Sequence, residues 1–140
     1  MGIDVFWKNP STGEWVLCDT AEKAKPMHLE KIRIRHEALE KEGFICSQGW
    51  RMNLGMEHAT LLDGGIRYAE QKAQPNITIR DYENGTHADV PLEVARGILE
   101  EIVARQMALL YGKWDLQARV KNAASLEELD ALKLEYVEGW

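Results

Sequence analysis

A long stripe of apolar residues in the second half of the chain limits the possible folds most strongly. It begins after Pro91, since proline suits the first position of a helix. Apolar side chains then recur every three or four residues to about residue 122, which predicts one long helix with a heptad-like seam. The seam positions hold Leu92, Ala95, Leu99, Ile102, Gln106, Leu109, Lys113, Leu116 and Val120, and Ile98, Val103, Met107, Leu110 and Trp114 widen the apolar surface.

So wide an apolar surface needs a partner, and two partners remain open. The seam packs either against the rest of its own chain or against a second copy of it. In the second case Gln106 and Lys113 interrupt the seam and would set its register or copy number. The candidate interface residues for this self-association are Leu92, Leu99, Ile102, Leu109 and Leu116.

A hairpin is predicted directly before this helix, over residues 77 to 90. Asn84-Gly85 is the strongest short hairpin signal, because a type I′ turn needs positive φ at both central residues. This turn would place Tyr82 opposite His87 and Ile79 opposite Val90. One face would then carry Ile77, Ile79, Ala88 and Val90, and the other Arg80, Tyr82, His87 and Asp89.

The polar face of this hairpin contains the best candidate for acid–base chemistry. His87, Tyr82 and Asp89 would lie close together, although an ordinary surface pair across the strands is the favoured interpretation of these residues. The chain contains no nucleotide-binding glycine loop, serine-nucleophile motif or zinc-protease motif. Its four histidines and two cysteines lack the spacing of metal ligands. We therefore predict a protein that is not an enzyme, with no catalytic residue, metal site or cofactor.

A second hairpin is predicted at the start of the chain, over residues 3 to 18. Two aromatic and β-branched runs flank "NPSTG", a cluster of turn-forming residues. Trp7 and Trp15 are expected to face each other across the strands. This hairpin is a candidate docking element, with packing onto the chain's own core as the alternative. The predicted organisation is a hairpin appendage over residues 1–25 and one α+β domain over residues 26–140.

Shorter elements fill the rest of the chain. Pro26 is expected to open a helix that ends before Gly43, with an apolar face of Leu29, Ile32, His36 and Leu39. Residues 44 to 54 are expected to form a short strand pair or an extended turn around Gln48-Gly49. A helix over 55 to 73 follows, and Gly64-Gly65 in this helix suggests a close backbone approach or a kink. Ser125 and Glu128 form a capping box for a short last helix. The fold class is therefore α+β, with short β-hairpins and three to four helices, including one long C-terminal helix.

The amino-acid composition limits the kinds of partner and cellular environment that the chain is expected to have. The net charge of −6 and the scattered basic residues argue against binding to nucleic acid. No apolar run approaches the 18 residues of a membrane-spanning helix, and the first ten residues do not resemble a secretory signal. Cys18 and Cys46 are expected to be free, buried or half-buried thiols in a reducing compartment.

About three quarters of the chain, residues 28 to 132, resembles an uncharacterised domain family of bacteriophage and prophage genes that accompany tail and tail-fibre genes. The resemblance rests on "KIRIRHEALEKEGF", on "CSQGWRMNLGMEHATLLDGGIRYA" and on "YENGTHADVPLEVARGI". The closest match is the long helix leading into "ARVKNAASLEELDAL". These motifs are structural, and the resemblance implies no cofactor, activity or site residues.

The resemblance implies a phage or prophage tail-associated structural or assembly protein that acts through protein–protein contacts. Its expected partners are other phage tail proteins and, through the long helix, itself, and no membrane is expected. Its expected location is the host bacterial cytoplasm or the virion tail. A small prophage-encoded regulatory or ligand-binding domain of the cytosol is the alternative, and an enzyme with a site assembled from distant residues is the third.

Overall fold

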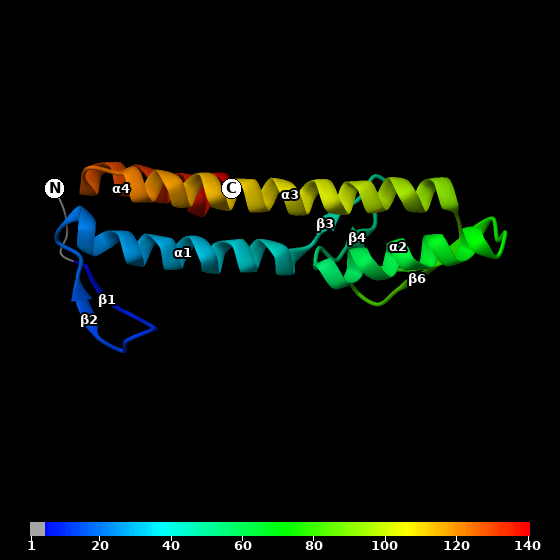
Figure 1. The fold of residues 1–140 in the computed structure, drawn as a ribbon, viewed down its shortest axis with the longest axis horizontal. Helices are drawn as coiled ribbons and strands as arrows, with labels where there is room; N and C mark the ends of the chain where they lie inside the picture. Colours follow the sequence, from blue (N-terminus) through cyan, green and yellow to red (C-terminus); the bar gives the residue numbers. More distant parts are fainter. Residues whose placement is uncertain (1–4) are drawn as a thin grey trace. The chain divides into compact units, whose positions relative to one another are not determined.

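The computed structural model describes residues 5–140, and these residues form four α-helices and three antiparallel strand pairs (Figure 1). The α+β fold class and the long helix near the C-terminus are confirmed. The elements are β1 (Phe6–Lys8), β2 (Trp15–Leu17), α1 (Ala21–Glu42), β3 (Phe44–Ile45), β4 (Arg51–Met52), α2 (Met56–Gln71), β5 (Asn76–Arg80), β6 (Thr86–Pro91), α3 (Leu92–Asn122), α4 (Leu126–Leu134) and a π-helical turn, η1 (Glu135–Gly139).

The chain divides into two compact units. Unit 1 comprises Met1–Glu37 and Leu110–Trp140, and unit 2 comprises Ala38–Leu109. Both boundaries fall inside helices, the first in α1 and the second in α3. This division differs from the predicted split at residue 25, because the β1–β2 hairpin packs on the core of unit 1 through Trp7 and Val16.

Unit 1 has a core built from β2, α1, α3, α4 and η1. Tyr136, Val120 and Leu129 are almost completely buried, with exposed fractions of 0 to 1%. The cap predicted for α4 is confirmed, since the Glu128 amide donates to Ser125 Oγ over 3.2 Å and Glu128 Oε2 accepts from the Ala124 amide. The core cluster consists of Cys18, Ala24, Met27, Ile32, Leu116, Val120, Ala123, Leu129, Leu132 and Tyr136.

Helix α1 begins five residues before the predicted start at Pro26, so that prediction is wrong. Thr20 caps the helix, because its Oγ1 accepts a hydrogen bond of 3.3 Å from the Lys23 amide. Pro26 lies inside the helix, where it cannot donate a backbone hydrogen bond. The additional turn brings Ala24 into the core of unit 1, and this burial offsets part of the cost of the proline.

The β1–β2 register corrects a second expectation. Trp7 pairs with Val16 and Lys8 pairs with Trp15, so the two tryptophans do not face each other. Paired residues point to the same face of a strand pair, and neighbours along a strand point to opposite faces. Trp7 and Trp15 therefore lie on opposite faces of the hairpin.

Unit 2 holds the end of α1 at a joint made by two strand pairs. Gly43 ends the helix with φ of +69°, as predicted, and a Cβ there would collide with the Met52 carbonyl oxygen. The Tyr82 hydroxyl donates to the Lys41 carbonyl over 2.8 Å, and the Arg51 guanidinium donates to the Glu42 carbonyl. The Arg51 guanidinium also lies over the Tyr82 ring, 3.8 Å from its centre. These contacts satisfy the carbonyls that a helix end leaves unpaired.

The predicted register of the β5–β6 hairpin is wrong, although the hairpin itself is present. Ile77 pairs with Val90 and Ile79 pairs with His87, with a bulge between the two pairs. Asp81 explains the longer loop, because its Oδ1 accepts hydrogen bonds from the amides of Glu83 and Gly85. Ile79 and Val90 are buried as expected, whereas Ala88 is exposed.

Helices α2 and α3 agree closely with their predicted bounds. The expected close approach at Gly64-Gly65 in α2 is absent, since an added Cβ would meet nothing within 4 Å at either glycine. A strand pair over 44 to 54 is confirmed as β3 and β4. Glu101 of α3 accepts hydrogen bonds of 2.9 Å from the Ser47 amide and hydroxyl, which attaches the β3–β4 turn to the helix.

Candidate functional site

The seam of α3 is largely core, and this changes its predicted role as an interface. Ile102, Leu109 and Leu116 have exposed fractions of 1%, 0% and 5% within the single chain. Leu92 and Leu99 are half-buried. Since the chain itself covers the centre of the seam, we assign Ile102, Leu109 and Leu116 to the core and not to a contact with a second copy.

The β1–β2 hairpin presents two different faces. Its inward face, with Trp7 and Val16, packs on the core of unit 1. Its outward face carries Phe6 and Trp15, which are 64% and 66% exposed. The β1–β2 pairing puts Phe6 opposite Leu17 and Trp15 opposite Lys8, so the two exposed aromatic residues are diagonal neighbours on this face. We call this surface, formed by Phe6, Lys8, Trp15 and Leu17, the outer hairpin face.

The predicted cluster of His87, Tyr82 and Asp89 does not form. Tyr82 is used at the end of α1, and Asp89 is an exposed residue in the bulge with φ of +56°. His87 instead pairs with Asp81, with 2.9 Å between Nε2 and Oδ2. The ring of His87 also stacks on Trp50, with 3.8 Å between ring centres and 16° between planes.

The Asp81–His87 pair stabilises the β5–β6 loop and its contact with the β3–β4 turn. Hydrogen bonding from His87 holds the pKa of Asp81 below its ordinary value, and the amides of Gly85 and Glu83 lower it further. These partners close the β5–β6 loop, and the stacking joins His87 to the β3–β4 turn. Because Nε2 is engaged by Asp81 and one ring face is covered by Trp50, we assign His87 to the packing of unit 2.

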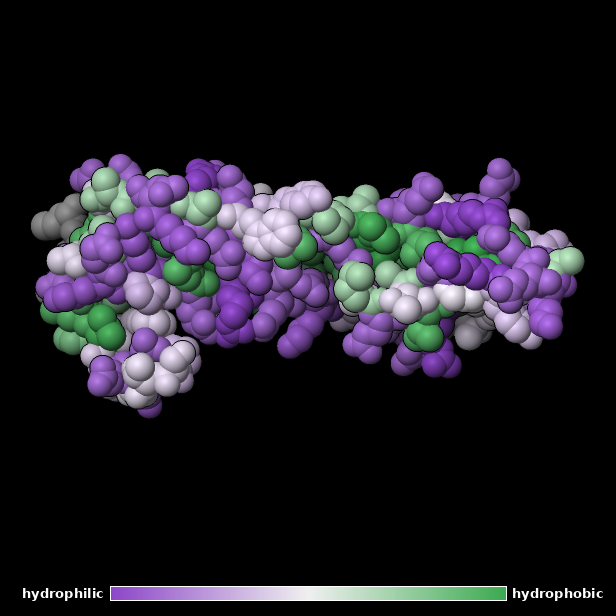
Figure 2. Space-filling view, in the orientation of Figure 1, coloured by the Kyte–Doolittle hydropathy of each residue, from purple (hydrophilic) through white to green (hydrophobic). Residues whose placement is uncertain are grey.

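Unit 2 also contains a cavity that no sequence motif indicated. Its volume is about 390 Å³, within the range of small-molecule sites. Its apolar floor is formed by Met52, Ile79 and Ile102, which are 1 to 4% exposed. Figure 2 shows hydrophobic residues gathered along the line between α2 and the first part of α3, where Leu61, Leu62 and Ile102 contribute to the lining.

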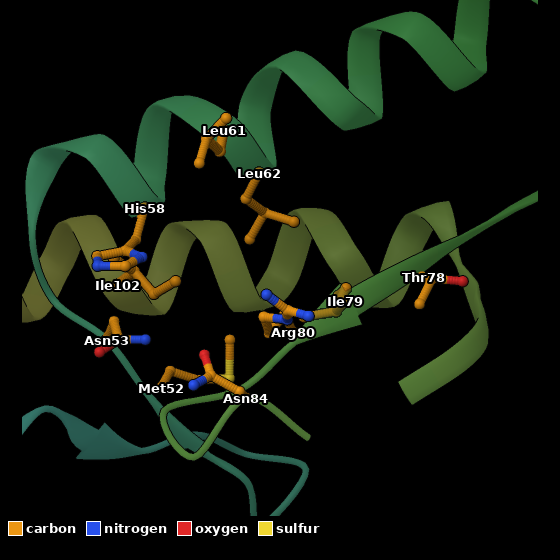
Figure 3. Close-up of a pocket in the computed structure, with 10 residues that line it drawn as sticks. All are labelled: Met52, Asn53, His58, Leu61, Leu62, Thr78, Ile79, Arg80, Asn84 and Ile102. Carbon is orange, nitrogen blue, oxygen red and sulfur yellow. The ribbon is translucent and has the colours of Figure 1, made fainter. Parts of the chain in front are cut away.

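The rim of this cavity is polar and carries no acidic side chain among the ten lining residues. Figure 3 shows His58 and Asn53 on one side, and Arg80 and Asn84 on the other. These residues come from α2, the segment after β4, β5 and the β5–β6 loop, so only folding brings them together. Among these residues the sequence singles out only Asn84, and the Asn84-Gly85 pair predicts a turn and not a cavity.

Residues 5–140 lack the features of two other kinds of site. Within this part of the chain, no group of three or more His, Cys, Asp or Glu side chains is arranged to hold a metal ion. The helices found there are too short or too polar to cross a membrane. Cys18 and Cys46 are free and buried, as predicted.

The chain matches no family model, and searches of curated proteins and of solved structures found no significant match.

Proposed function

We propose that this protein is a non-enzymatic structural or assembly protein that acts through protein–protein contacts. The observation that carries the proposal is the outer hairpin face, where Phe6 and Trp15 stand more than 60% exposed. Exposing two large aromatic side chains forgoes the free energy of their burial, and tryptophan is among the residues most enriched at the centres of interfaces. A partner that covers both rings would recover that free energy.

The packing of the inward face supports the same role. Trp7 and Val16 anchor the hairpin on unit 1, so Phe6 and Trp15 are displayed on a supported surface. A hairpin with such support needs little ordering when it binds, which favours association. The proposed setting, a phage or prophage tail, rests on the resemblance of residues 28 to 132 to tail-associated domains, and the proposed partners are other tail proteins.

Co-purification with the products of the neighbouring genes tests this proposal. The chain is co-expressed with the product of each adjoining gene, and the mixture is separated by size-exclusion chromatography. We expect the wild type to co-elute with one of these products, and the double variant Phe6→Ser/Trp15→Ser to lose that co-elution. Ile34→Ser is the matched control, because Ile34 is a 52% exposed apolar residue on α1 of the same unit.

Two results would contradict the proposal. In the first, the wild type co-elutes with none of the proteins encoded beside it. In the second, the control Ile34→Ser lowers co-elution as much as the double variant does. Circular dichroism of each variant verifies that the helices are retained.

A further inference from the structure

The cavity of unit 2 has an apolar floor and a rim that favours negative charge. Met52, Ile79 and Ile102 contribute aliphatic and thioether groups to this floor, and all three side chains are buried. A hydrocarbon group laid on this floor would be removed from water on one side, which is favourable in proportion to its area.

Arg80 gives the rim its charge. Its guanidinium lines the cavity beside Asn84 (Figure 3). Within residues 5–140 no carboxylate lies in ion-pair distance of Arg80, although most of the other arginines there are paired, as Arg67 is with Asp63 over 3.1 Å. An unpaired guanidinium offers a planar set of donors that matches a carboxylate with two parallel hydrogen bonds.

The combination selects one chemical class. A bare inorganic anion would use Arg80 but make no contact with the apolar floor. An alkyl amine would use the floor but be repelled by Arg80. A neutral alkyl compound would leave the guanidinium without an anionic partner.

We propose that this cavity binds a small organic carboxylate with a short aliphatic body. The carboxylate pairs with the Arg80 guanidinium, the Asn84 amide contributes a further hydrogen bond, and the hydrocarbon lies over Met52, Ile79 and Ile102. This site is separate from the outer hairpin face, so it adds a ligand to the proposed contact role and does not depend on it.

Methyl NMR spectroscopy of the full chain tests the site with hexanoate as the probe. Resonances of the Met52, Ile79 and Ile102 methyl groups are followed while hexanoate, hexanamide or acetate is added. Hexanamide keeps the body without the charge, and acetate keeps the charge without the body. We expect saturable shifts of the three floor methyl groups with hexanoate, and weaker binding of both other compounds.

Two arginine variants distinguish the site from general charge attraction. Arg80→Gln removes the proposed anchor, and Arg67→Gln removes the same charge from the exposed surface of α2 in the same unit. We expect Arg80→Gln to raise the Kd of hexanoate about tenfold or more, because a charge-assisted bidentate pair is lost. Arg67→Gln should leave that Kd within about twofold, since it lies outside the cavity.

The proposal is overturned by any of three results. Hexanoate leaves the floor methyl resonances unchanged, or hexanamide binds as tightly as hexanoate, or the two arginine variants weaken binding equally. Unchanged spectra of Arg80→Gln without ligand would show that its fold is intact and that a loss of binding belongs to the site.

Discussion

Gly97 and Gly112 both lie within α3, but their surroundings differ. A Cβ at Gly97 would meet nothing within 4 Å, whereas a Cβ at Gly112 would lie 2.5 Å from Trp140 Nε1. Trp140 also stacks on His36, with 5.8 Å between ring centres. The absence of a side chain at Gly112 therefore allows the indole to pack in unit 1.

Alanine substitution separates these two roles of glycine. We expect Gly97→Ala to stabilise the protein by about 0.5–1 kcal/mol, because alanine favours the helix. Gly112→Ala should destabilise it by up to about 2 kcal/mol, since the collision with Trp140 exceeds the same helical gain. Urea denaturation measures both, and equal stabilisation by the two variants would show that Trp140 does not need this space.

His28 is the buried residue of unit 1 with the clearest consequence for pH. It is 2% exposed, and its Nδ1 lies 2.8 Å from the Tyr136 hydroxyl. Burial, with a smaller contribution from the charge of Lys31, lowers the pKa of His28 to about 4, while Asp130 acts in the opposite direction. The unfolded chain therefore takes up a proton on His28 at a higher pH than the folded chain does.

Stability should fall as the pH drops from about 6.5 toward 4, because protonation then favours the unfolded state. The slope from one such histidine is at most about 1.4 kcal/mol per pH unit. We expect His28→Gln, which does not titrate there, to show a smaller loss between pH 7 and pH 4.5. Urea denaturation at several pH values measures this, and parallel curves for variant and wild type would contradict it.

At the scale of elements, the end of α1 depends on contacts from two strand pairs. Tyr82→Phe removes the hydroxyl that donates to the Lys41 carbonyl but keeps the ring under Arg51. We expect a loss of about 0.5–1.5 kcal/mol, the usual contribution of one hydrogen bond. Tyr68→Phe is the control on α2, since Tyr68 is 56% exposed and should change stability by less than about 0.5 kcal/mol.

The comparison of these two variants by chemical denaturation checks the capping role. If Tyr82→Phe is no more destabilising than Tyr68→Phe, water replaces the hydroxyl at the helix end without cost. Trypsin cleavage near Lys41 offers a second readout, because a helix end that frays exposes its backbone.

At the scale of the whole molecule, the seam of α3 is expected to govern folding and not assembly. Leu109 is completely buried, so Leu109→Ala should cost about 2–5 kcal/mol through the cavity it leaves. Leu134→Ala is the control, because Leu134 is 64% exposed and should change stability by less than about 0.5 kcal/mol. Denaturation measures the stability, and sedimentation measures the mass. If Leu109→Ala changed the mass measured by sedimentation without lowering the stability, Leu109 would belong to a contact with a second copy of the chain.

The sequence by itself determined the elements whose signals are local. The apolar stripe predicts α3, Ser125 and Glu128 predict the start of α4, and Gly43 predicts the end of α1. Each of these signals works within a few residues of itself, through caps, turns and the period of a helix. The other helices and hairpins are also indicated by local signals, and the α+β class follows from them.

Only the tertiary structure decided how those elements use their surfaces. Thr20 and the burial of Ala24 place the start of α1 before Pro26. Asp81 gives the β5–β6 hairpin a different register from the one that the Asn84-Gly85 turn predicts. Each of these local preferences is worth about 1–3 kcal/mol, so a few distant contacts can outweigh it. The cavity lined by Met52, Ile79, Arg80 and Ile102 is still harder to predict from the sequence. Its lining residues are spread between positions 52 and 102, and only the folded backbone brings them together.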